Sequence, residues 1–238
     1  MIHALLFVFG CCIGSFINVM FSRKDWYKGR SRCDECGYVL EWYDLIPVVS
    51  FLMLGGKCRK CKTKIDGSHL VSELMMGAAF LVSSLCFEWY GIVYGLLASA
   101  VLFSMAVAAI EDYKEQMVYN FILTGGIILA TCVKCGYYIY AGFYIDAMKI
   151  LGGVFILKLL AIFASLIFQD KIGSGDFDVL IIIYIIGGLS GLLISVTAAS
   201  LIGCLVYLPS IVLKKRNKKD PLPFIPLLLM GTMCFLVI

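Results

Sequence analysis

Two aspartates stand at the edges of apolar stretches that are long enough to be membrane helices. Asp112 follows the apolar run 91–110, and Asp176 ends the segment "GSGD" just before another apolar run. A carboxylate at a membrane edge is costly unless it has a partner or a function. When two carboxyl groups share one proton, the ionised group can take a proton from water while the protonated group polarises a carbonyl. Asp112 and Asp176 are therefore a candidate pair for peptide hydrolysis.

The same two residues also admit a purely structural interpretation. An Asp at the start of a helix is often an N-cap, and Asp176 fits that role. Asp112 is badly placed for capping, because a negative charge at a helix C-terminus opposes the helix dipole. Further carboxylates lie nearby, at Asp178, Glu111 and Glu115. From the residue types alone, catalysis and helix capping both stay open.

A second group of residues has the spacing of a metal site. Four of the 11 cysteines form two Cys-x-x-Cys pairs in a charged loop: Cys33, Cys36, Cys58 and Cys61. Two such pairs in a reducing compartment are typical of a tetrahedral zinc site. A site with four thiolate ligands has no open position, so we expect structural Zn²⁺ that lets a small loop fold. The segment "CVKC" (132–135) lies in an apolar run without a second pair, and we interpret it as helix packing.

The composition excludes an ordinary water-soluble domain. Of the 238 residues, 61% are hydrophobic and 15% are charged, whereas soluble domains carry about a quarter charged residues. A helix needs about 20 apolar residues to cross the hydrocarbon core, so we expect membrane spans wherever such runs occur. The candidate runs are 2–21, 69–88, 91–110, 118–138, 145–168, 177–213 and 222–238.

The run 177–213 is too long for a single crossing. As one helix it would extend about 55 Å, nearly two bilayers. The segment "GGLSG" (187–191) lies in its middle and is typical of a turn, so we predict two spans there. The predicted fold is thus an all-α polytopic membrane protein with about eight transmembrane helices and a small cytoplasmic zinc-knuckle loop domain.

The positive charges predict which side of the membrane each loop occupies. Lys and Arg residues gather in the segment 22–68 and in "KKRNKK" (214–219), whereas the opposite loops hold few. Loops rich in Lys and Arg stay in the cytoplasm, so we expect the loop 22–68 inside and both termini outside. The same order of spans brings Asp112 and Asp176 to the cytoplasmic face. We expect the 214–219 stretch to face anionic lipid and not nucleic acid.

Six segments, in chain order, resemble motifs of the type IV prepilin peptidases, which form a GxGD class of membrane aspartic proteases. They are the segments 14–23, 32–65, 72–77, 112–120, 173–176 and 223–231. Three positions depart from the family pattern. Tyr119 replaces the usual Pro, Asp178 stands where a Lys commonly follows GxGD, and Ile225 replaces a Gly in the last motif.

The resemblance implies an activity and a substrate. Asp112 and Asp176 would be the catalytic pair, supported by Gly173, Gly175 and Asn120. Such an enzyme removes the leader peptide of type IV prepilins and related pseudopilins at the cytoplasmic face of the inner membrane. Its substrate is itself an apolar membrane helix, and membrane lipid surrounds both partners.

The resemblance also implies a second activity. Many members with a Cys₄ loop methylate the new N-terminus with S-adenosylmethionine. The resemblance points to Gly56 and Glu73 as possible contacts of the methyl donor or the substrate. A hydrogen-bond network between helices is the structural alternative for Glu73. No role is assigned to Lys158, which lies near the middle of a predicted span.

The predicted domains are the first span (1–21), the zinc-binding loop (22–68) and a transmembrane aspartic peptidase domain (69–238). Three alternative functions are weighed. One is a peptidase without methyltransferase activity, and another is a methyltransferase with an inactive protease site. The third is a zinc-stabilised membrane transporter or assembly scaffold that uses buried charges such as Glu73 and Lys158. Transporters often contain paired repeats, and the sequence shows no convincing repeat.

Overall fold

The structure is a computed structural model that describes residues 1–22, 27, 29–33, 35–115, 118, 120–168, 174–212 and 223–238. Its described elements are all helices, apart from two isolated bridges in the loop at Arg32–Val39 and Lys57–Lys64. This confirms the predicted all-α class. The chain forms two compact units, unit 1 (Met1–Leu81) and unit 2 (Val82–Ile238). The predicted division into functional domains at 21/22 and 68/69 stays a prediction.

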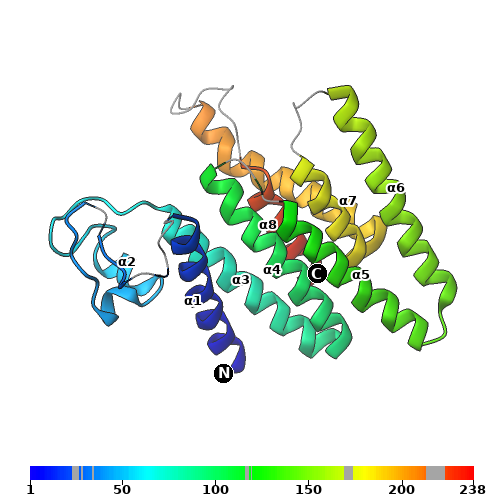
Figure 1. Cartoon of the computed structure of the whole chain (residues 1–238), viewed down its shortest axis with the longest axis horizontal. Helices are drawn as coiled ribbons and strands as arrows, with labels where there is room; N and C mark the ends of the chain where they lie inside the picture. The colour runs from blue at the N-terminus through cyan, green and yellow to red at the C-terminus, as the bar shows by residue number, and fades with distance from the viewer. Residues whose placement is uncertain are drawn as a thin grey trace. The chain divides into compact units, whose positions relative to one another are not determined.

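Unit 1 contains α1 (Ile2–Ser22), the short 3₁₀ helix η1 (Trp42–Leu45), α2 (Val49–Met53) and the first part of α3 (Ser68–Tyr90) (Figure 1). The helices α1 and α3 approach closely at Gly10 and Gly14. A Cβ at these glycines would lie 2.7 Å from the Met76 carbonyl oxygen and 2.6 Å from the Ser72 carbonyl oxygen. This spacing of two glycines four residues apart is typical of close helix packing in membranes.

A buried polar contact accompanies this close packing. The amide nitrogen of Asn18 donates to the Ser72 hydroxyl at 2.9 Å, and both side chains are buried. A polar group that is removed from solvent must find such a partner. The contact therefore fixes the register of α1 on α3.

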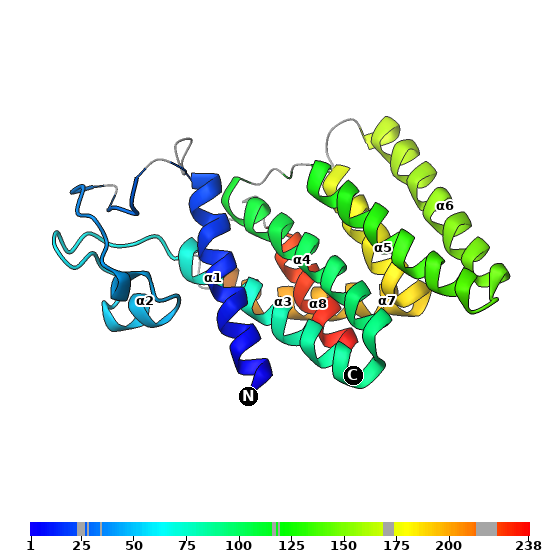
Figure 2. The same ribbon diagram turned by 60° about the horizontal axis from the view of Figure 1, so that its bottom comes forward.

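Unit 2 contains the remainder of α3 together with α4 (Ile92–Glu115), α5 (Asn120–Tyr140), α6 (Tyr144–Phe168), α7 (Ser174–Val212) and α8 (Ile225–Val237). Figures 1 and 2 show α8 beside α4 and α7, and α6 at the outer edge next to α5 and α7. The core lies along α4 and the first half of α7, where Leu102 and Ile182 are fully buried. Most of α6 is exposed and apolar, as expected for a helix that faces lipid.

The long helix α7 is broken at the predicted turn. Gly188 has φ 63° and ψ −159°, which interrupts the helix inside the segment 187–191. The ammonium group of Lys134 donates to the carbonyl oxygens of Ile185 and Ile186, the latter at 3.2 Å. These carbonyls precede the break, and in a membrane their hydrogen bonds must be made within the protein. Lys134 therefore closes the end of the first half of α7.

Six helices are long and apolar enough to cross a membrane: α1, α3, α4, α5, α6 and α7. The break in α7 and the helix α8 account for the other two predicted spans. However, α8 has 13 residues, shorter than the roughly 20 that one crossing needs. The basic stretch 214–219 lies outside the described residues.

Candidate functional site

The four cysteines predicted as zinc ligands come together in unit 1. Cys33 Sγ lies 3.9 Å from Cys61 Sγ, and Cys36 Sγ lies 4.0 Å from Cys58 Sγ. All four sulfur atoms lie within 4.8 Å of one another. Zinc–sulfur bonds of about 2.3 Å in a tetrahedron place neighbouring sulfurs roughly 3.8 Å apart. The cluster therefore fits one zinc ion with every position filled by a thiolate.

Two matching turns hold these cysteines. In the first, the N–H of Cys33 donates to the Tyr38 carbonyl at 2.9 Å, and in the second the N–H of Cys58 donates to the Thr63 carbonyl at 2.8 Å. The Thr63 hydroxyl also lies 3.2 Å from Cys61 Sγ, and its hydrogen bond lowers the pKa of Cys61 to about 6. Zinc binds the thiolate form of cysteine, so the second turn prepares one ligand for the metal.

The other Cys-x-x-Cys segment is separate from this cluster. Cys132 and Cys135 lie within α5, the first exposed and the second buried. Within the described residues, the four-cysteine cluster is the one group of three or more His, Cys, Asp or Glu side chains placed to hold a metal ion.

The aspartate pair, Asp112 and Asp176, lies within unit 2. Asp112 is in the last turn of α4, and Asp176 is in the first turn of α7. Both side chains are partly buried, and the two carboxylates are close enough for the charge of Asp112 to act on Asp176. Asp112 Oδ2 also accepts a hydrogen bond of 3.0 Å from the backbone N–H of Ile225, the first residue of α8. Three helix ends therefore meet at this pair.

The supporting residues of the GxGD motif are described only in part. Gly175 is buried, and a Cβ there would lie 3.2 Å from Val118 Cβ, which leaves little room for a side chain. Asn120 is the first residue of α5, and its side chain lies outside the described atoms. Gly173 and Tyr119 also lie outside the described residues. Because α7 begins at Ser174, Asp176 is inside the helix and does not occupy the N-cap position.

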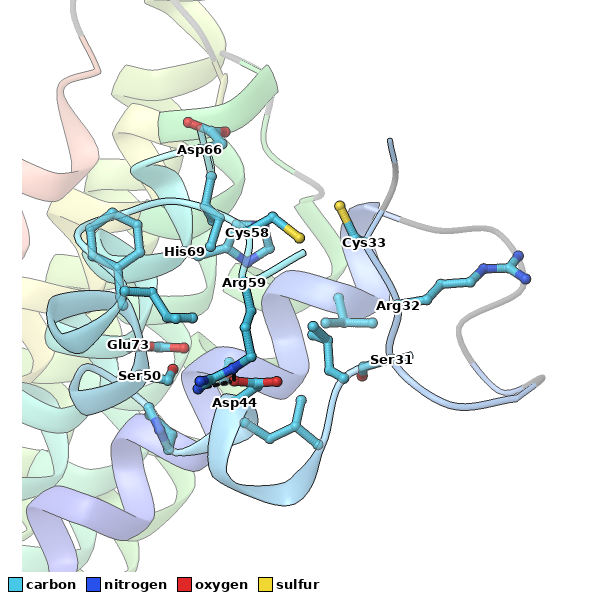
Figure 3. A pocket seen from close by; sticks show the side chains of 18 of the residues that line it. Ser31, Arg32, Cys33, Asp44, Ser50, Cys58, Arg59, Asp66, His69 and Glu73 are labelled. Carbon is cyan, nitrogen blue, oxygen red and sulfur yellow. Dashed lines mark hydrogen bonds and ion pairs between the residues drawn. The ribbon is translucent and has the colours of Figure 1, made fainter. Parts of the chain in front are cut away.

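A cavity of about 620 Å³ lies in unit 1, between α1, α3 and the zinc loop (Figure 3). Glu73 from α3 reaches this cavity and is itself 7% exposed. Its Oε2 accepts the backbone N–H of Val48 at 2.7 Å, and the Ser15 hydroxyl on α1 also donates to it. Within the described residues, no cation forms an ion pair with Glu73. The cavity therefore contains a buried carboxylate whose charge is balanced by hydrogen bonds alone.

The Val48 contact holds an unusual piece of backbone. Val48 has φ 62° and ψ −51°, which a β-branched residue rarely adopts. Such a conformation persists only where the surroundings fix it, and the hydrogen bond to Glu73 provides one such constraint. Gly56, the other predicted contact, has φ 67° and is not among the residues that line the cavity.

An ion pair forms another wall of the cavity. The Arg59 side chain donates two hydrogen bonds, of 2.9 and 2.8 Å, to Asp44 Oδ1, and Figure 3 shows this pair near Glu73 and Ser50. The Asp44 side chain is 1% exposed, whereas the Arg59 side chain is 47% exposed. The guanidinium group also lies 4.9 Å from the centre of the Tyr43 ring. Arg59 therefore joins the loop around η1 to the second cysteine turn.

Comparison with known proteins gives one family match and several relatives. Residues 8–87 match the family model described as the bacterial peptidase A24 N-terminal domain. A prepilin leader peptidase/N-methyltransferase of Bacillus subtilis is 27% identical over 96% of this chain and 91% of the relative. The chain is a homologue of the prepilin peptidases. This confirms the resemblance predicted from the six segments.

Two further prepilin leader peptidase/N-methyltransferases agree with this result. The protein from Vibrio cholerae is 29% identical over 74% of each chain. The protein from Myxococcus xanthus is 40% identical over 106 residues, which cover 43% of this chain and 31% of the relative. No solved structure matches the chain. The six membrane-capable helices, taken with these homologues, indicate a multi-pass inner membrane protein.

The structure gives this prepilin peptidase homologue a partner for Lys158. The Lys158 ammonium group on α6 forms a hydrogen-bonded ion pair with Asp178 Oδ1 on α7. Asp178 is 6% exposed and lies two residues after Asp176. The positive charge beside Asp178 thus comes from a neighbouring helix. A carboxylate and an ammonium group inside a membrane are expected to pair in this way.

Three features of these sites were not predicted from the sequence. They are the hydrogen bond from Ile225 to Asp112, the Arg59–Asp44 pair and the cavity beside Glu73. The first two include residues of the family-like segments 223–231 and 32–65. Those segments could have drawn attention to these residues. However, residue type alone does not identify a backbone donor or a partner that is distant in sequence.

Proposed function

We propose that the chain is a membrane aspartic endopeptidase that removes the leader peptide of type IV prepilins and related pseudopilins. We propose in addition that it methylates the new N-terminus with S-adenosylmethionine. The observation that carries the proposal is that Asp112, in the last turn of α4, and Asp176, in the first turn of α7, lie near enough for the charge of Asp112 to act on Asp176. The names of the three relatives, prepilin leader peptidase/N-methyltransferase, support both activities.

The proposed cleavage uses the two carboxyl groups in different protonation states. The ionised aspartate takes a proton from water, whose oxygen forms a bond to the scissile carbonyl carbon. The protonated aspartate gives its proton to the carbonyl oxygen. Breakdown of this intermediate breaks the carbon–nitrogen bond, and the leaving amine receives a proton from the pair. Two carboxyl groups that share one proton meet this requirement near neutral pH.

The proposed orientation places this chemistry at the cytoplasmic face. The loop 22–68 holds half of the 20 Lys and Arg residues and would remain in the cytoplasm, with both termini outside. Asp112 and Asp176 would then face the side on which a prepilin leader lies. The substrate would be an apolar helix that approaches through the lipid.

The zinc site is proposed to stabilise the loop and not to take part in the reaction. The four thiolates of Cys33, Cys36, Cys58 and Cys61 would fill every position around the ion. Because the loop has little apolar core, binding of the metal would supply much of its folding free energy.

The cavity of unit 1 is the proposed site of the methyl donor. Its volume of about 620 Å³ falls within the roughly 300–1,000 Å³ of small-molecule sites. S-adenosylmethionine would supply a methyl group from its sulfonium, a cation that the buried carboxylate of Glu73 can attract. Arg59 keeps N–H groups beyond those bound by Asp44, and they could hold a carboxylate of the ligand. Gly56 does not line the cavity, so its role would be to let the loop adopt its backbone conformation at φ 67°.

Co-expression with a prepilin-like substrate tests the cleavage. We expect mass spectrometry to show leader removal by the unaltered chain and its loss in Asp112→Asn and Asp176→Asn. The matched control is Asp146→Asn, which removes an exposed carboxylate that pairs with Lys149 on α6. In the same spectrum, an added methyl group on the mature N-terminus reports the second activity. Cleavage that survives either substitution of the pair would contradict the mechanism, and no cleavage by the unaltered chain would favour a transporter or scaffold.

A further inference from the structure

The first turn of α8 contacts one member of the aspartate pair. The backbone N–H of Ile225 donates to Asp112 Oδ2 at 3.0 Å, and the backbone N–H of Phe224 also donates to this carboxylate. The next residue, Pro226, has no N–H to offer. The two donors at the start of α8 are thus both directed at Asp112.

This contact favours the ionised form of Asp112. The first N–H groups of a helix have no acceptor within the helix, and the helix N-terminus carries a partial positive charge. A carboxylate that accepts such N–H groups is stabilised in its charged form. Ile225 is 1% exposed, so the bond is sheltered from water, which strengthens it.

Asp176 has a different environment. Asp176 lies in the first turn of α7, where the helix dipole also favours a negative charge. Within the described residues, however, no group donates a hydrogen bond to its carboxylate. The charge of Asp112 acts on Asp176 and disfavours a second negative charge there. Among the described residues, the difference between the two aspartates is the pair of direct backbone donors at Asp112.

Among the residues that the structure describes, the other charged groups near the pair are already engaged or belong to α4. The helix α8 contains no Asp, Glu, Lys, Arg or His. On α5 the charged residue is Lys134, which contacts carbonyl oxygens before the break in α7. On α7, Asp178 is paired with Lys158 of α6. The neighbouring residues Glu111 and Lys114 lie on α4 itself. Within the described part of the chain, the backbone donors of α8 are therefore the asymmetry that the structure shows.

We infer that Asp112 is the ionised member of the pair, held in this state by the amides of Phe224 and Ile225. Asp112 then accepts the proton of water, and Asp176 gives its proton to the carbonyl oxygen of the substrate. The inference rests on the proposed function for these chemical roles. The segment "PFIP" at 223–226 is thereby a positioning element for the base, with Ile225 as its central residue.

Titration of each aspartate in the absence of the other directly tests which of the two ionises at the lower pH. In Asp176→Asn the remaining Asp112 is followed, and in Asp112→Asn the remaining Asp176 is followed. The C=O absorption of a protonated carboxyl group, recorded against pH by infrared difference spectroscopy, gives each midpoint. We expect Asp112 to ionise at the lower pH, and the reverse order or equal midpoints would overturn the inference. Because no substrate is needed, this outcome is independent of whether the chain cleaves prepilins.

Removal of the donor tests the role of α8. Ile225→Pro removes the N–H at a helix start, where Pro is tolerated, and Ile225→Ala removes the side chain but keeps the N–H. Loss of the donor disfavours the ionised form of Asp112, so cleavage by Ile225→Pro needs a higher pH. Relative to Ile225→Ala, we expect the acidic limb of the rate profile to move up by about one pH unit, about a tenfold loss on that limb.

Identical acidic limbs for these two variants would show that α8 acts only through packing. Ile225→Gly, which restores the common residue of the family at this position, is expected to behave like Ile225→Ala. If Ile225→Pro does not fold, as judged by its yield and thermal unfolding, the titration of the two Asn variants still decides the inference.

Discussion

The zinc turns of unit 1 and the aspartate pair of unit 2 are held in different ways. In unit 1, the ligands lie three residues apart within each turn, and the turns are closed by local hydrogen bonds. In unit 2, Asp112 and Asp176 come from different helices, and a third helix supplies the backbone donor. A local site can be recognised from spacing, whereas a site at meeting helix ends depends on how the helices pack.

The largest effect should follow from the loss of a single zinc ligand. Cys58 is 5% exposed and belongs to the second turn. We expect Cys58→Ser to abolish stoichiometric zinc and to leave the loop open to protease, because a structural site depends on all four ligands. Metal analysis of the purified protein and limited proteolysis would measure this.

The matched control for this variant is Cys132→Ser, which changes the isolated Cys-x-x-Cys segment of α5. It should retain one zinc per chain. Full zinc content in Cys58→Ser would contradict the assignment of the four cysteines as zinc ligands. It would also remove the contrast between this local site and the aspartate pair, which depends on helix packing.

The next largest effect should separate the two proposed activities. Glu73→Gln keeps an oxygen acceptor for the Val48 N–H but removes the charge from the cavity. If the carboxylate attracts the sulfonium, methylation should fall about tenfold or more, which corresponds to about 1.4 kcal/mol. Mass spectrometry of the processed pilin would show cleavage unchanged and the methylated fraction reduced.

Glu88→Gln, at an exposed position further along α3, provides the control with the same change of charge. It should leave both activities intact. A loss of cleavage in Glu73→Gln would mean that unit 1 supports the peptidase site and that the two regions do not act separately.

A smaller effect is expected at the ion pair between α6 and α7. Lys158→Leu leaves Asp178 as a buried carboxylate without a cation. Breaking a fully buried pair costs about 3–5 kcal/mol, and the 39% exposure of the Lys158 side chain reduces this to about 2 kcal/mol. Unfolding in mixed detergent micelles would measure the loss.

The double variant Lys158→Leu with Asp178→Leu removes both charges together. It should recover most of the lost free energy of unfolding, because no unpaired charge remains. Equal losses in the single and double variants would show that α6 is held by its apolar contacts alone.

The smallest effect concerns the contact of α1 with α3. Gly14→Ala places a Cβ 2.6 Å from the Ser72 carbonyl oxygen and forces the helices apart. We expect a loss of about 1 kcal/mol in the free energy of unfolding, at the lower end of what overpacking costs. Gly125→Ala, where a Cβ meets no atom within 4 Å, should be neutral or slightly stabilising. Similar effects at both positions would contradict close packing at Gly14.

The sequence predicts most of the fold because membrane helices are defined by length and apolar composition. The run 69–88 and the helix Ser68–Tyr90 agree closely, and the turn predicted at 187–191 coincides with the break at Gly188. Helix ends are less predictable, since α7 begins at Ser174 instead of 177 and α8 is shorter than its predicted span. Polar residues at helix ends can belong to either the helix or the loop.

The candidate sites were predictable to different degrees, because one depends on local spacing and the other on how helices pack. The cysteine ligands follow from spacing, and the structure brings them together as expected. The pairing of Lys158 with Asp178 and the donor from Ile225 join residues on different helices. Their identification requires the packing of α6, α7 and α8, which no local pattern in the sequence contains.

The contact of Lys134 with the break in α7 has a consequence for biosynthesis. The helix α5 is made before α7, and it is the least apolar of the six long helices. When α5 first meets the translocon, the carbonyl acceptors of Lys134 have not been synthesised, so its charge opposes entry into the bilayer. We therefore expect stable insertion of α5 to depend on α7. Truncation of a nascent chain before residue 185 should leave α5 accessible to reagents at the membrane surface.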